Sequence, residues 1–280
     1  MRASRRHLVI AAVFAGVVLC GSLLLAQQIW RGGYGRRGMA PRWAKLSDFN
    51  GTFLYCRGYY DQVRGEAGGV GWWTDYPAAD HNFSVRLAEL TRIYVKDWST
   101  QPNFVVVSLE DPLLYRCPLL FMEDVGTLRL SDTEVRNLRD FFLKGGFLWV
   151  DDFWGSAAWQ YWSHEIARVL PPSEFQMIDI PTTHPIMHTL YDVKEFPQIP
   201  SINFWSSQSY HETSERGRDS AEVHFRGIQD AHGRLMVLMT HNTDIADSWE
   251  REGESAQYFD LFSPRGYAIG VNVVLYAMTH

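Results

Sequence analysis

The pattern of apolar and polar positions from about Ser47 onward alternates between strand-like and helix-like runs. Apolar runs predict strands at 51–58, 103–109, 118–124 and 147–150. Residues at helical spacing predict helices at 79–95 and 131–144. Strands that alternate with helices are typical of an α/β domain with a mostly parallel central sheet.

The helix at 131–144 has the clearest local signals. Ser131 and Glu134 form the S-x-x-E pattern of a capping box, and Gly145 suits the left-handed position after the last turn. The sequence "FLWV" (147–150) follows and is apolar at every position. A strand that is covered by helices on both faces typically has apolar residues at every position. We therefore expect a central strand that leads directly into Asp151 and Asp152.

The second half of the chain predicts a helix at 155–170, a strand at 175–180 and a hairpin at 222–242 around the turn "DAHGR". A short helix is expected at Pro185, an irregular surface loop at 201–220, and a closing apolar helix at 263–280. Asp80 and Ser156 are predicted to cap the helices that follow them.

The N-terminus has a different pattern. A basic head precedes 19 uncharged apolar residues, which is typical of a secretory signal and is also just long enough to span a bilayer. We expect residues 1–26 to be a signal peptide or membrane anchor, 27–47 a basic Gly-rich linker, and 48–280 a single α/β domain. The protein is then exported, periplasmic or anchored in the inner membrane, with membrane contact through the N-terminal segment only.

The net charge of the chain limits the kinds of partner that we expect it to bind. Residues 1–26 contain three arginines and no acidic residue, so the remainder carries 23 basic and 32 acidic residues and a formal charge of −9. This balance argues against nucleic-acid binding. In an exported domain, Cys56 and Cys117 could form one disulfide, although buried free thiols fit equally well.

Candidate chemistry gathers at the predicted strand ends, because open α/β sheets bind ligands at the carboxyl ends of their strands. The polar residues there are Arg57, Glu123, Asp124, Asp151, Asp152, Asn242 and Asp244. Adjacent residues of a strand point to opposite faces, so the two neighbouring aspartates need not act together. Structural hydrogen bonding and a ligand or metal site both remain open for them.

Metal and catalytic motifs are weak. His184 and His188 have the H-x3-H spacing of two ligands on one helical face, and His241 is a further candidate metal ligand. A hydrolase would use Asp151, His184 and Asp244 as acid, base or metal ligands. The chain lacks the G-x-S-x-G elbow, and its "GEAGGVG" loop lacks the G-K-[ST] of a phosphate-binding loop. No motif indicates a cofactor.

Several blocks together resemble a known bacterial family. These are "GGVGWWTDYPAADHNFSVRLAELTRI", "PLLFMEDVGTLRLSDTEVRNLRDFFLKGGFLWVDD", "THPIM" and "HNTDIADSWE" with "GYAIGVNVVLYAMTH". In this order they are similar to the domain of unknown function 4159, over roughly 48–280. The resemblance implies a three-layer, flavodoxin-like fold related to class I glutamine amidotransferases. It also puts Asp151 where such folds carry the nucleophile cysteine, and thus implies no glutaminase activity.

Three functions follow from these observations. The first is an envelope domain that binds a small molecule or a protein partner in a cleft lined by Trp73, Glu123, Asp124, Asp151 and Asp152. The second is the hydrolase, either metal-dependent or with an Asp/His pair. The third is a purely structural component of a larger envelope complex.

Overall fold

The computed structural model describes residues 41–95 and 103–280, and these form one compact unit that begins at Pro41. The last residues of the predicted linker already belong to this unit, because Arg42 Nη1 donates to Phe104 O (2.7 Å) and Ala44 N donates to Val106 O (2.9 Å). The predicted signal or anchor lies outside the described residues. Among the helices that are described, none is long and apolar enough to cross a membrane.

The centre of the unit is a seven-stranded sheet of order β3-β1-β4-β6-β9-β8-β7. The first five strands are mutually parallel, and the hairpin partner β8 and the edge strand β7 are added antiparallel. The mostly parallel sheet predicted from the sequence is thus confirmed. The strands are β1 (Tyr55–Tyr59), β3 (Phe104–Ser108), β4 (Leu119–Glu123), β6 (Phe147–Phe153), β7 (Met177–Asp179), β8 (His224–Gln229) and β9 (Leu235–His241).

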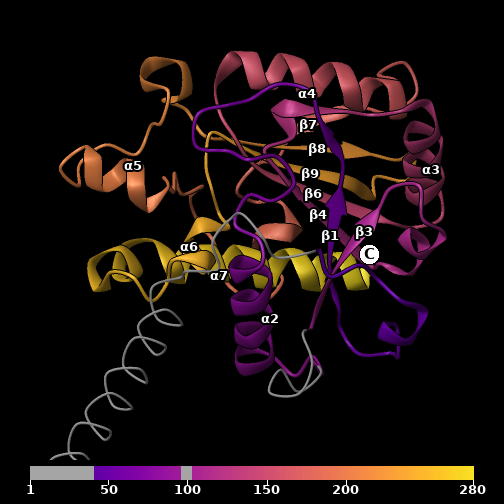
Figure 1. The fold of residues 1–280 in the computed structure, drawn as a ribbon, viewed down its shortest axis with the longest axis horizontal. Coiled ribbons are helices and arrows are strands. Elements are labelled where there is room, and N and C mark those ends of the chain that lie inside the picture. The colour runs from indigo at the N-terminus through magenta and orange to yellow at the C-terminus, as the bar shows by residue number, and fades with distance from the viewer. Residues whose placement is uncertain (1–40, 96–102) are drawn as a thin grey trace, which may run out of the picture. The chain divides into compact units, whose positions relative to one another are not determined.

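Helices cover both faces of the sheet (Figure 1). α2, α6 and α7 pack against one another on one face, and α3 and α4 pack together on the other. β2 (Asp61–Gln62) and β5 (Leu128–Arg129) form a separate two-stranded ladder. The helices are α2 (Ala78–Leu90), α3 (Asp132–Leu143), α4 (Gly155–Val169), α5 (Ile202–Ser207), α6 (Asp247–Glu250) and α7 (Ala256–Thr279).

Local signals around the central strand act as predicted. Ser131 Oγ accepts from Glu134 N at 3.1 Å while the Glu134 carboxylate accepts from Ser131 N at 2.7 Å, which completes the capping box of α3. Gly145 has φ +98° and ends the helix. The following strand β6 is buried at all seven positions, as a strand between two helical layers must be.

Two predicted helix caps are wrong. Asp80 lies inside α2, whose N-cap is Pro77, and its carboxylate pairs with Arg57 instead. Ser156 lies inside α4, and the Asp219 carboxylate accepts from Ser156 N at 2.9 Å. In both cases the helix begins before the predicted cap residue, and that residue contacts a side chain from a distant part of the chain, which a local sequence pattern could not reveal.

Some element boundaries in the structure also differ from the predicted ones. The predicted loop at 201–220 contains α5, and the closing helix begins at Ala256 rather than at 263 and continues through Pro264.

The two alternatives for the cysteines are resolved by a disulfide between Cys56 and Cys117, which joins β1 to the segment just before β4.

Candidate functional site

The carboxyl ends of three neighbouring strands share an unusual backbone conformation. Asp124 after β4, Asp152 in β6 and Asn242 after β9 have φ of +50°, +48° and +63°. Asp124 N donates to Asp152 O, and Asn242 N donates to Phe153 O, both at 3.1 Å. Non-glycine residues in this left-handed region are uncommon, and they gather at functional sites. The carboxyl edge of the sheet is therefore a candidate functional site.

Asp151 and Asp152 have different environments. Asp151 Oδ2 accepts from Ala246 N at 3.0 Å, and its Oδ1 lies 2.5 Å from Thr240 Oγ1. Asp152 Oδ1 instead accepts from Trp154 Nε1 at 2.8 Å. The structural alternative that the sequence left open therefore describes Asp151 well, because both of its oxygens are satisfied within the protein.

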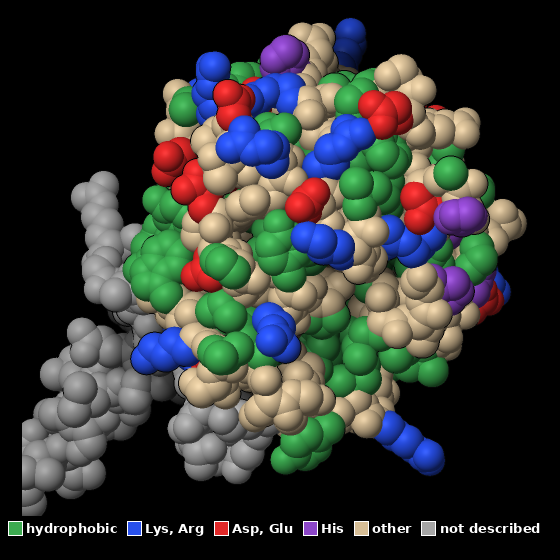
Figure 2. All heavy atoms as spheres, turned by 90° about the vertical axis from the view of Figure 1, so that its right-hand side faces the viewer, with side chains coloured by type: hydrophobic (Ala, Val, Ile, Leu, Met, Phe, Trp, Pro, Cys, Tyr) green, Lys and Arg blue, Asp and Glu red, His purple; other side chains and the backbone are tan. Residues whose placement is uncertain are grey.

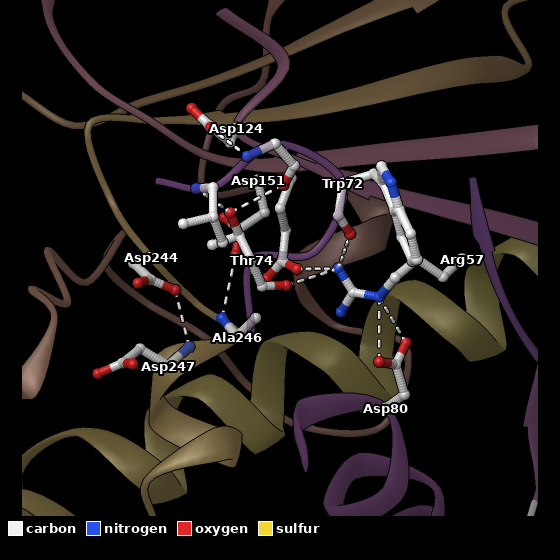
Figure 3. Close-up of polar contacts among 12 residues, drawn as sticks. Arg57, Trp72, Thr74, Asp80, Asp124, Asp151, Asp244, Ala246 and Asp247 are labelled. Carbon is white, nitrogen blue, oxygen red and sulfur yellow. Dashed lines mark hydrogen bonds and ion pairs between the residues drawn. The ribbon is translucent and has the colours of Figure 1, made fainter. Parts of the chain in front are cut away.

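Arg57 is the buried cation of the edge (Figure 3). Its Nε donates to both oxygens of Asp80, at 2.9 and 3.0 Å, and its Nη1 pairs with Glu123 and donates to Thr74 O at 2.9 Å. Its Nη2 has no partner within the protein. Arg57 thus shares its single positive charge between one carboxylate on α2 and one on β4.

Three buried carboxylates meet next to this arginine, and we call Asp75, Glu123 and Asp244 the acidic trio. They offer one oxygen each, and these oxygens all lie within 4.8 Å of one another. The three residues are 3, 0 and 3% exposed. Asp75 Oδ2 and Glu123 Oε1 have no hydrogen-bond partner, whereas Asp244 Oδ1 accepts from Asp247 N at 2.7 Å. The trio therefore contains two buried acceptors that no donor of the described residues satisfies.

Burial raises the pKa of each member of the acidic trio well above its ordinary value. Neighbouring carboxylates add to this, including Asp152 beside Asp244 and Glu250 beside Asp75, whereas Arg57 lowers the pKa of Glu123. Burial likewise raises the pKa of Asp151 to about 7. Such a cluster must either hold protons or hold a cation, since unpaired buried carboxylates are costly.

A second acidic group adjoins the trio and shares Asp75 with it. Asp247 and Glu250 of α6 each offer an oxygen within 4.8 Å of the Asp75 carboxylate. Arg251 lies against this second group, with its Nε 2.5 Å from Glu250 Oε2 and 3.6 Å from Asp247 Oδ1. The second group thus has a cation of its own from the protein.

The glycine-rich loop after β2 closes over the edge. Asp124 Oδ2 accepts from Gly71 N at 2.7 Å, and a Cβ added at Gly69 would lie 2.3 Å from Asp124 Cγ. Only glycine permits this close approach. Asp124, whose pKa burial raises to about 7, therefore anchors the loop that carries Thr74 and Asp75 into the site.

Trp73 belongs to an aromatic group beside the site. Its ring centroid lies 4.3 Å from that of Trp72 and 5.3 Å from that of Tyr76. The adjacent carbonyls of Trp72 and Thr74 accept from Arg57 Nη1. Trp73 therefore lies in the loop that builds the site, with its ring packed on other aromatic side chains.

The structure does not bring the predicted histidines to the acidic trio. His184 and His188 flank a three-residue 3-10 helix rather than sharing a helical face, and His184 Nδ1 accepts from Ile186 N. The ring of His184 lies 5.8 Å from that of Tyr276, which packs on Phe147 at the amino end of β6. Four residues of strand, about 13 Å, separate Phe147 from Asp151.

His241 also lies apart from these carboxylates. Its Nε2 is 3.0 Å from Gly155 O, and its ring packs on Phe153 and Trp159. In the part of the chain that the structure describes, the groups with metal-like spacing contain only carboxylates. The histidine-based metal hypothesis therefore has no geometric support there.

A family model described as a domain of unknown function (DUF4159) matches residues 62–278. The chain belongs to the DUF4159 family. No curated protein matches the sequence.

The DUF4159 match includes the whole acidic trio, whereas β1 and Arg57 precede it. The sequence analysis named Glu123 and Asp244 as candidates but missed Asp75. This residue lies in the loop before α2, far from both of them in the sequence. The available signal was a single charged residue within "WWTDYP", a stretch otherwise rich in aromatic side chains. Charged side chains are rarely buried unless they are paired or bind a metal, and this makes such a position worth testing.

Proposed function

We propose that this DUF4159 protein is a non-catalytic ligand-binding domain of the cell envelope, and that its ligand is a cation that binds at the acidic trio. The observation that carries the proposal is the pair of open acceptors, Asp75 Oδ2 and Glu123 Oε1, in a site that is almost fully buried. A positively charged ligand stabilises carboxylates that otherwise have no partner.

The strand order supports a ligand at this position. When the five parallel strands are numbered along the chain, their spatial order is 2-1-3-4-5. This is the flavodoxin-like order, and ligands of such sheets bind outside the carboxyl ends where the order reverses. Here the reversal lies between β1 and β4, which carry Arg57 and Glu123. On the basis of this order we propose that the domain has a flavodoxin-like fold.

The proposed role is binding rather than amide hydrolysis. By the resemblance to amidotransferase-like folds, Asp151 stands about where those folds carry the nucleophile cysteine, and a carboxylate cannot form the thioester of that reaction. The alternative hydrolase with Asp151, His184 and Asp244 loses support, because His184 packs near the opposite end of β6. An Asp/His pair requires contact directly or through one water.

Two features support the envelope location. The N-terminal apolar run has the composition of a signal peptide or anchor. The Cys56–Cys117 disulfide fits an oxidising compartment such as the periplasm, since cytosolic thiols are kept reduced. A small organic cation or a metal ion could reach the site there.

Thermal unfolding of the full chain at pH 8 tests the cationic ligand. The panel contains CaCl2, MgCl2, MnCl2 and spermidine, with NaCl at matched ionic strength, sodium phosphate and glucose as controls. We expect at least one cation to raise Tm by about 5–10 °C at a hundredfold excess over its Kd. Equal Tm values in all cations and in the NaCl control would refute the proposal, as would hydrolysis of glutamine by the protein.

A further inference from the structure

We infer that the acidic trio binds one hard divalent cation, Ca²⁺, Mg²⁺ or Mn²⁺, through carboxylate oxygens of Asp75, Glu123 and Asp244. This inference rests on the proposed cationic-ligand function and narrows its ligand to a metal ion. The three residues come from the loop before α2, the end of β4 and the segment after β9, so only the folded domain assembles them.

The oxygen geometry suits such an ion. Calcium takes oxygen ligands at 2.3–2.6 Å and magnesium at 2.0–2.1 Å, so one ion spans oxygens about 4–5 Å apart. The three trio oxygens lie within 4.8 Å of one another. Three carboxylates leave further coordination positions for water, as both ions ordinarily require.

Unsatisfied acceptors point to a ligand independently of the acidic composition. Asp75 Oδ2 and Glu123 Oε1 lack any donor, and the other Glu123 oxygen already pairs with Arg57. Tyr55 Oη, which is buried beside the same charges, also has no partner. Buried polar atoms in native proteins almost always have partners, so several orphans in one place indicate that other molecules complete the site.

Burial favours an inorganic ion over an organic cation. The trio is at most 3% exposed, and a single-atom ion requires less space in so buried a site than an ammonium or guanidinium group does. The adjoining group at Asp247 and Glu250 leads from the trio toward the surface, because the Glu250 side chain is 13% exposed. Arg251 neutralises that group, so a single ion is expected in the trio itself.

Isothermal titration calorimetry of the full chain at pH 8, after treatment with chelator and dialysis, tests the inference. The probes are Ca²⁺, Mg²⁺ and Mn²⁺ alone. We expect about one ion per chain for at least one probe, and a loss of affinity of at least about tenfold in Asp75→Asn and in Asp244→Asn. In chelator, Asp75→Asn should be at least as stable as the wild type, because it removes the charge of a buried carboxylate whose Oδ2 has no donor.

The matched control is Glu165→Gln. Glu165 is a buried carboxylate on α4 that accepts from Leu130 N and pairs with Arg168, and its substitution makes the same charge change outside the trio. We expect this variant to keep wild-type affinity. The inference is overturned if folded wild type binds none of the three ions, or if both trio variants bind them as wild type does. Stabilisation by spermidine but by no metal would overturn it and leave the proposed function standing, whereas no response to any cation would refute both.

Discussion

Arg57 and the carboxylates around it set the electrostatics of the site at the scale of single residues. One guanidinium contacts Asp80 and Glu123, and the acidic trio begins at the second of these. Breaking a buried ion pair leaves an uncompensated charge, which makes each of these residues sensitive to substitution. Within this group of buried charges, the negative charge of the acidic trio exceeds the positive charge that Arg57 supplies.

His241 is the opposite case, a buried side chain that is kept neutral. Its pKa is lowered to about 4, mainly by burial and to a smaller extent by the nearby Arg226 and His224, whereas the hydrogen bond with Gly155 O and the charge of Asp219 act in the opposite direction. Its Nε2 lies 3.0 Å from Gly155 O. In the unfolded chain the same imidazole has its ordinary pKa near 6.5.

A pH dependence follows from this difference. Between about pH 6.5 and 4 the unfolded chain binds a proton at His241 before the folded domain does, so this residue lowers the free energy of unfolding as pH falls. The slope is at most about 1.4 kcal/mol per pH unit. We expect His241→Gln to remove this contribution, so that its stability relative to wild type improves as pH falls from 7 to 5.

Urea denaturation of both proteins at pH 7, 6 and 5 measures the effect. The carboxylates with raised pKa respond in the opposite direction, but they do so equally in both proteins, so the difference isolates His241. Parallel curves for the two proteins would contradict the assignment of a depressed pKa to this residue.

At the scale of elements, α3 and the strand it feeds are specified locally. The capping box of Ser131 and Glu134 begins the helix, and Gly145 ends it. The next strand, β6, then carries Asp151 and Asp152 to the carboxyl edge. A disturbance of this helix should therefore affect stability without changing the chemistry of the site.

Ser131→Ala tests this separation. The substitution leaves Glu134 N without its side-chain acceptor and should lower the free energy of unfolding by about 1 kcal/mol. Ser206→Ala, an exposed serine in α5, serves as the control and should change little. Chemical denaturation measures both variants. A Ser131→Ala protein that matches wild type within error, or one that loses cation binding, would contradict the separation of helix and site.

At the scale of the whole molecule, the disulfide and the distribution of charge matter most. The Cys56–Cys117 bond joins residues 61 positions apart and links β1 to the chain entering β4, the two strands between which the strand order reverses. On the face drawn in Figure 2, basic, acidic and apolar side chains are interspersed. The acidic trio is by contrast a concentration of one sign of charge inside the domain.

Removal of the disulfide should destabilise the whole domain. A cross-link across a loop of this length restricts the unfolded chain, and its loss typically costs about 2–5 kcal/mol. We expect Cys56→Ala/Cys117→Ala to show this loss in urea denaturation, and a reductant to destabilise the wild type but not the double variant. If reductant leaves the denaturation curve of the wild type unchanged, the disulfide contributes nothing to stability.

Much of the fold was predictable because its signals are short-range. The apolar run at 147–150, the capping box at Ser131 and the turn in "DAHGR" each specify an element from a few neighbouring residues. The rule that parallel strands present their carboxyl ends at one edge then identified Glu123, Asp151 and Asp244 as neighbours. The caps predicted at Asp80 and Ser156 are wrong, because each helix begins before that residue, and both residues contact partners far away in the sequence instead.

The sequence by itself determined the elements, the parallel sheet and the edge at which its polar residues gather, since hydrophobic periodicity and capping act over one or two turns of chain. Tertiary structure alone decided which carboxylates meet. It brought Asp75 to Glu123 and Asp244, left the histidines elsewhere, and gave Asp151 its hydrogen bonds from Ala246 and Thr240. Burial and the distance between charges depend on residues far apart in the chain, and these quantities decide whether an aspartate is a structural acceptor or an open ligand.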